Sequence, residues 1–183
     1  MARVPDLKPE EMTAEQKRLA QKIAGPRGGV VRGPFAIWLR HPALVDKADE
    51  LGNLLREGTS VPRRLSELAI LVTARQWTAQ YEWFAHERQA REVGIADAVI
   101  DAIRNRTRPQ FDKADEQVVY DLASELYENK AVSDKTYNAA IQALGQMTVI
   151  ELVTIATFYA MIAMILVTFQ APLPEGTKPP LPV

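Results

Sequence analysis

The chain has 183 residues, with 22 Lys and Arg against 23 Asp and Glu, a formal net charge of −1, and no cysteine. The absence of cysteine excludes disulfide scaffolds, cysteine-ligated zinc, iron–sulfur clusters and thiol chemistry. The near-neutral charge argues against a protein built to bind nucleic acid, because the phosphate backbone demands a basic face. A chain of this length forms one domain that buries about 70% of its unfolded surface. Small molecules are therefore the first partners to consider.

The two ends of the chain are rich in proline, which predicts extended arms over residues 1–12 and 171–183 of a single domain. The N-terminal segment is charged and has no apolar run, so we expect no signal peptide and a cytoplasmic location. Thr13 followed by Gln16 predicts a capping box at the start of a first helix. The glycine-containing segment 25–34 lacks the Lys-Ser/Thr of a phosphate-binding loop and is interpreted as a connector.

Helical periodicity continues from residue 42 to the C-terminal arm with short breaks at glycine, proline or capping residues. No alternating run flanked by hairpin turns predicts a strand. The sequence around 65–68 is echoed at 149–152, which favours two related helical halves. The expected fold is all-α, a bundle of seven to eight helices, at about 13–25, 42–57, 63–77, 80–93, 97–105, 112–126, 133–145 and 148–169.

The last predicted helix is unusually apolar. Residues 152–169 contain no charged side chain, a length that approaches the roughly 20 residues of a membrane span. Three threonines and a tyrosine interrupt the apolar run, and Thr148 with Glu151 predicts a capping box at its start. A helix that is apolar all round can also be buried in a core or a subunit interface. We expect a buried helix rather than a membrane span.

Acid–base chemistry is the function class that the remaining residues favour. Glu82 and His86 are four residues apart and project from the same helix face. Glu67 lies among apolar residues of the preceding helix, where a carboxylate needs a partner. If the two helices form an antiparallel hairpin, Glu67 meets His86, and a carboxylate–imidazole–carboxylate cluster favours a protonated histidine that can donate its proton. An ion pair of Glu67 with Arg63 or Arg64, and a purely structural His86, remain alternatives.

Substrate-binding residues are expected close to this cluster. Arg75 or Arg88 could pair with a substrate carboxylate, although solvated or ion-paired arginines are the alternative. His41, which precedes a proline, is expected to act in helix entry. The aromatic residues nearby could supply flat apolar walls, and the alternative is that they belong to the core: Trp77, Tyr81, Trp83 and Phe84.

A metal site is not expected. Glu67, Glu82 and His86 would offer two carboxylates and one imidazole, but the chain has a single Glu-x-x-x-His. Di-iron bundles instead repeat Glu-x-x-His on two helices.

Segment 64–94 resembles the carboxymuconolactone decarboxylase family, which also contains the alkylhydroperoxidase D-like (AhpD-like) proteins. The resemblance rests on RLSELAIL at 64–71, Tyr-Glu-Trp at 81–83, His86 and the Gly-Ile break at 94–95. It extends more loosely to Gly-Pro-Phe at 33–35, His-Pro at 41–42 and the apolar C-terminal helix. This resemblance covers most of the chain and implies an AhpD-like fold with a family core at about 36–105.

The resemblance also implies a function. The peroxidase branch carries a Cys-x-x-Cys pair, whose positions are Ala79 and Glu82 here, so peroxidase activity is the least expected. The decarboxylase branch implies a carbon–carbon lyase acting on a small lactone or carboxylic acid, with His86 as proton donor, Glu82 tuning it and Glu67 orienting it or acting as a second acid–base group. An unsaturated lactone accepts the electrons itself, so no cofactor is required.

Two further expectations follow from the resemblance. The alternative function is that of a non-catalytic family member that binds a small ligand or serves as an oligomeric scaffold. The family and the long apolar helix together imply a homo-oligomer, a trimer or a hexamer, with no nucleic-acid or membrane partner.

Overall fold

The computed structural model describes residues 2–25 and 29–182, and within them it contains helices and no strand. The all-α prediction is confirmed. The helix that the sequence did not predict is α2, which has five residues and is too short to show a helical period. The elements are η1 (Pro9–Glu11), α1 (Ala14–Ala24), α2 (Pro34–Trp38), α3 (Pro42–Glu57), α4 (Arg63–Gln76), α5 (Gln80–Glu92), α6 (Asp97–Arg104), α7 (Ala114–Asn129), α8 (Asp134–Leu144) and α9 (Gln146–Phe169).

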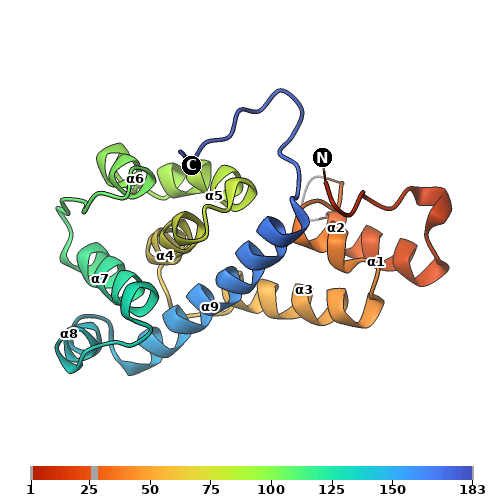
Figure 1. Ribbon diagram of the computed structural model, residues 1–183. Helices are drawn as coiled ribbons and strands as arrows, with labels where there is room; N and C mark the ends of the chain where they lie inside the picture. Colours follow the sequence, from red (N-terminus) through yellow and green to blue (C-terminus); the bar gives the residue numbers. More distant parts are fainter. Residues whose placement is uncertain (1, 26–28, 183) are drawn as a thin grey trace.

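Helix α4 is the centre of the bundle. Every residue from Leu65 to Arg75 is buried, because α4 packs against α5, α7 and α9 on different sides. A helix surrounded in this way must be apolar around most of its circumference. Figure 1 shows α4 beside α9, with α5 to α8 on one side of α9 and α1 to α3 on the other. The two helices that carry the sequence echo, α4 and α9, therefore pack on each other.

Helix α9 uses one face for packing and exposes the other. An 18-residue window of this 24-residue helix has a mean hydropathy of 2.3, and the helix is long and apolar enough to cross a membrane. The inner face instead packs on α4, with Leu152, Ile155 and Ile162 among its buried residues. The outer face leaves several large apolar side chains exposed: Met147, Ile150, Met161, Met164 and Val167.

Three of the predicted helix starts are confirmed. Thr13 and Gln16 form the capping box of α1. The Ser133 side chain accepts a hydrogen bond from the backbone N–H of Thr136 at the start of α8. His41 caps α3, since its Nδ1 accepts a hydrogen bond from the N–H of Leu44.

The predicted capping box at the start of α9 is wrong. The helix begins two residues earlier, at Gln146, after Gly145, which has a φ of 81°. Glu151 is thereby released from capping, and its carboxylate accepts hydrogen bonds from the backbone N–H and the hydroxyl of Ser60. These hydrogen bonds attach α9, through Glu151, to the loop between α3 and α4.

Both ends of the chain are attached to the bundle. The backbone N–H and the guanidinium of Arg3 donate to carbonyl oxygens in the last turn of α9, those of Phe169 and Thr168. The C-terminal segment runs from α9 back to α5 (Figure 1), where the Gln80 amide makes two hydrogen bonds of 2.9 Å with the backbone of Leu181. The connector predicted at 25–34 falls partly outside the described residues, which omit 26–28.

Candidate functional site

A cavity of about 560 Å³ lies beside His86. Helices α5 and α9 form two of its walls, and the end of α3, the start of α4 and the segment from residue 30 to 35 complete it. This volume is within the usual range for a small-molecule site. The lining residues are Val30, Arg32, Pro34, Phe35, Arg56, Glu57, Arg63, Tyr81, Glu82, Ala85, His86, Arg88, Gln89, Tyr159, Ile162 and Leu166.

His86 is held by Glu67, as the hairpin prediction requires. The Nδ1 of His86 lies 2.7 Å from Oε2 of Glu67, and only 1% of the Glu67 side chain is exposed. Because an ionised carboxylate can only accept, Nδ1 carries the hydrogen of this bond. Nε2, for which the described residues provide no partner, is then the ring nitrogen available to a ligand.

Glu67 also forms an ion pair with Arg63, the structural alternative that the sequence analysis gave for this carboxylate. The Nε of Arg63, one turn earlier on α4, donates to Oε1 of Glu67 at 2.9 Å. The same guanidinium donates to the side chain of Gln89 at 2.6 Å. Arg64 pairs elsewhere, with Asp115 and Glu116. Both oxygens of Glu67 are therefore occupied, which fixes the carboxylate and, through it, the imidazole ring.

Helix α9 supplies a second contact to the imidazole. The Tyr159 ring lies edge-on to His86, with the two centroids 5.0 Å apart and the planes at 88°. Burial raises the pKa of Tyr159 to about 12, so the phenol stays protonated. His86 is thus clamped between a carboxylate and an aromatic ring, and its side chain is 12% exposed.

Glu82 behaves differently from its predicted role. It is 2% exposed, and neither carboxyl oxygen has a hydrogen-bond partner among the described residues. Burial raises its pKa well above the ordinary value, which favours the neutral acid over the carboxylate. The predicted cluster of two carboxylates around His86 is therefore incomplete, since only Glu67 bonds to the ring. Spacing of i and i+4 places two residues on one face but does not oblige them to meet.

Two of the predicted binding residues lie at the cavity and two do not. Tyr81 lines it, and Arg88 lies at its rim with a side chain that is 83% exposed. Trp83 is fully buried in the core, and its indole N–H donates to Glu87 at 2.7 Å. Arg75 is also buried, and its Nε donates to the carbonyl of Arg104 at 2.8 Å.

The structural role of Arg75 has a physical cause. A buried guanidinium needs hydrogen-bond acceptors, and here Thr78 and the carbonyl of Pro182 accept one hydrogen bond each from its two terminal nitrogens. Arg75 therefore ties α4 to the turn before α5 and to the end of the chain. Arg75 does not line the His86 cavity and is not placed to bind a substrate carboxylate there.

Sequence reasoning missed three arginines that line the cavity. Arg32 comes from the connector, Arg56 from the end of α3 and Arg63 from the start of α4. With Arg88, four guanidinium groups line the cavity, of which Arg63 is paired with Glu67. The carboxyl groups in the lining are those of the largely exposed Glu57 and of Glu82, whose pKa is raised by burial. The cavity is therefore electropositive and suited to an anion.

Comparison with known proteins identifies the fold. No family model and no curated protein matches the sequence. Among solved structures, a peroxidase-related protein from Silicibacter sp. TM1040 has a TM-score of 0.76 at 13% identity, over 93% of this chain and 91% of that one. An Agrobacterium tumefaciens protein of unknown function, provisionally assigned as the antioxidant defence protein AhpD, has a TM-score of 0.67 at 13% identity, over 75% of this chain and 95% of that one. The fold is the AhpD-like fold.

A third similar structure is of a protein with a named activity. It is a cysteine-to-alanine variant of the debrominase Bmp8 in complex with 2,3,4-tribromopyrrole, with a TM-score of 0.75 at 12% identity over 94% of this chain and 91% of that one. At this identity the likeness shows the fold alone. The present chain has no cysteine.

No group of three or more histidine, aspartate and glutamate side chains in residues 2–25 and 29–182 is arranged to hold a metal ion.

Proposed function

We propose that the protein is an acid–base enzyme acting on a small carboxylate, and specifically a cofactor-independent decarboxylase of an unsaturated lactone carboxylate. The observation that carries the proposal is the pairing of two proton donors on one electropositive cavity. One is His86, oriented by Glu67 at 2.7 Å, and the other is the neutral carboxylic acid of Glu82.

The chemistry requires a place for one electron pair and a source for one proton. When the bond between the substrate carboxylate and the ring carbon breaks, CO2 leaves and the electron pair passes into the conjugated lactone. The lactone carbonyl oxygen then carries developing negative charge, which a preorganised donor stabilises. Neutral Glu82 can donate a hydrogen bond to this oxygen.

His86 then supplies the proton to the lactone ring carbon that has gained electron density. The imidazolium donates from Nε2, and the adjacent Glu67 carboxylate stabilises its positive charge before the transfer. Arg56, Arg63 and Arg88 are placed to hold a carboxylate of the substrate at the cavity wall. Water returns the proton to His86 after the product leaves, so the cycle consumes no cofactor.

Turnover of 4-carboxymuconolactone, followed by loss of its ultraviolet absorbance and by CO2 release, tests the proposal. The wild type is expected to turn over, and His86→Ala to lose about 10²- to 10⁴-fold in kcat with an unchanged far-ultraviolet circular dichroism spectrum. Glu15→Gln, at an exposed position on α1 that does not line the cavity, is the control and keeps full activity. Thermal shifts with lactone and aromatic carboxylates without any turnover would favour the non-catalytic alternative instead.

We also propose that the outer face of α9 pairs with further copies of the chain in a trimer or a hexamer. Positions 147, 150, 154, 157, 161 and 164 recur at alternating spacings of three and four, the pattern of a helix–helix seam. The hydroxyls of Thr154 and Thr157 bond to backbone carbonyls of their own helix, those of Ile150 and Thr154. The seam therefore presents neither charge nor an unsatisfied polar group, and a second uncharged seam is its natural partner.

A further inference from the structure

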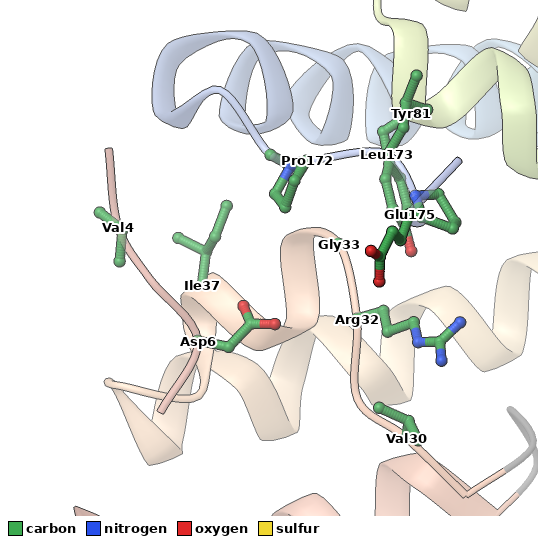
Figure 2. Close-up of a pocket in the computed structure, with 12 residues that line it drawn as sticks. Val4, Asp6, Val30, Arg32, Gly33, Ile37, Tyr81, Pro172, Leu173 and Glu175 are labelled. Atoms are coloured by element: carbon green, nitrogen blue, oxygen red, sulfur yellow. The ribbon is translucent and has the colours of Figure 1, made fainter. Parts of the chain in front are cut away.

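A second cavity lies next to the His86 cavity, under the C-terminal segment. It has a volume of about 280 Å³. Figure 2 shows the segment around Pro172, Leu173 and Glu175 passing along it, with Tyr81 from α5 on one side and Ile37 and Arg32 on the other. We call it the tail chamber. Since a water molecule occupies about 30 Å³ of liquid, it has room for a ring or a short alkyl chain.

The tail chamber and the His86 cavity share part of their walls. Val30, Arg32 and Tyr81 line both. Tyr81 directly precedes Glu82 on α5, so the same residue borders the proposed acid and the second chamber. A ligand bound at His86 can therefore extend past the Tyr81 ring into the tail chamber.

The position of Tyr81 depends on a glycine. A Cβ atom on Gly33 would lie 2.6 Å from Cε1 of Tyr81, and Gly33 has a φ of 61°. Only glycine permits both this φ and the close approach. The ring is thus held against the backbone at the start of α2, where it acts as a partition between the two cavities.

The chemistry of the chamber defines what it can hold. Its walls contain the apolar side chains of Val4, Ile37 and Leu173 together with the carboxylates of Asp6 and Glu175, which disfavour an anionic group inside the chamber. The segment over it is fixed at its far end by the two Gln80–Leu181 hydrogen bonds. Arg32, at the junction, forms no hydrogen bond or ion pair with any part of the chain that the structure describes. An anionic head beside the arginines and an apolar extension in the chamber would match this distribution.

We propose that the tail chamber is a second subsite that takes the apolar substituent of an elongated carboxylate whose head lies in the His86 cavity. Tyr81 selects for substrates with such a substituent by controlling the passage between the two cavities. This inference rests on the proposed function, because it places the reacting carboxylate beside His86.

Calorimetric titration with benzoate and with 4-pentylbenzoate tests the inference on the full chain. The two probes share one anionic head and differ only in the apolar tail. Leu173→Trp fills the chamber. Thr177→Trp adds the same side chain to the same segment at a position that lines neither cavity, and it is the matched control.

The wild type and Thr177→Trp are expected to bind 4-pentylbenzoate at least tenfold more tightly than benzoate. Leu173→Trp is expected to reduce this preference below threefold and to leave the Kd for benzoate within twofold of the wild type. An unchanged preference in Leu173→Trp, or no preference in the wild type, would overturn the subsite while leaving the proposed function intact. If neither probe binds, the carboxylate site of the proposed function fails, and the subsite fails with it.

Discussion

The burial of the Glu82 carboxyl group predicts a distinct dependence of stability on pH. The folded-state pKa of Glu82 lies well above its ordinary value of 4.5, because burial removes the carboxyl group from water. In the unfolded chain the same group ionises near its ordinary pKa. Below pH 4.5 both states hold the proton, and above it unfolding releases one. The free energy of unfolding therefore falls as pH rises from 4.5 towards the folded-state pKa.

The magnitude follows from linkage. A difference of one bound proton between the two states changes the free energy of unfolding by about 1.4 kcal/mol per pH unit. Glu82→Gln removes the ionisation and keeps the size of the side chain. Relative to the wild type, this variant should therefore gain stability between pH 5 and pH 6, by at most about 1.4 kcal/mol.

Urea unfolding at pH 5 and pH 6, at one fixed protein concentration, measures this difference. Glu15→Gln provides the control, since it is the same substitution at an exposed position on α1. A stability difference between Glu82→Gln and the wild type that stays constant across this range would refute the reasoning. It would mean that the Glu82 carboxyl ionises in the folded protein with its ordinary pKa.

Two other predictions concern the arginines and the outer face of α9. Arg75→Ala should lower the free energy of unfolding by about 2 kcal/mol, which corresponds to a fall in Tm of about 4–8 °C, and should leave the Kd for benzoate unchanged. Arg56→Ala should weaken the binding of benzoate at least fivefold. Equal effects of the two substitutions on benzoate binding would contradict the assignment of Arg75 to structure and Arg56 to the cavity. Light scattering of the wild type should give three or six times the 20.4 kDa mass of one chain. Met161→Glu should give the mass of one chain, and the control Gln142→Glu on α8 should behave like the wild type. A monomeric wild type would disprove the seam.

The sequence predicted those parts of the site that depend on local order. The i, i+4 spacing and the turn at Thr78 place α4 and α5 side by side, and the contact of Glu67 with His86 follows from this hairpin. The buried position of Glu67 was visible as a carboxylate within an apolar helix. The helices themselves follow from periodicity and capping residues, with the exception of the short α2.

The remaining features of the site depend on how segments that are distant in the sequence pack together. Arg32, Arg56 and Arg63 lie on three separate segments, and only the docking of α3 and the connector against α5 brings them to one cavity. Trp83 and Arg75 could not be distinguished from wall residues, because their partners, Glu87 and Pro182, are fixed by packing elsewhere. Glu82 shares a helix face with His86, yet Glu67 already occupies Nδ1 of the ring.

The central claim is that His86, oriented by Glu67, delivers the proton to the lactone ring carbon that gains the electron density released when CO2 leaves. Turnover of 4-carboxymuconolactone in D2O, with the product analysed by nuclear magnetic resonance, tests it most directly. A positioned donor places one deuteron on a single face of that carbon, and we predict this outcome for the wild type together with a loss of turnover in His86→Ala. Deuterium distributed over both faces, or undiminished turnover in His86→Ala, would contradict the account.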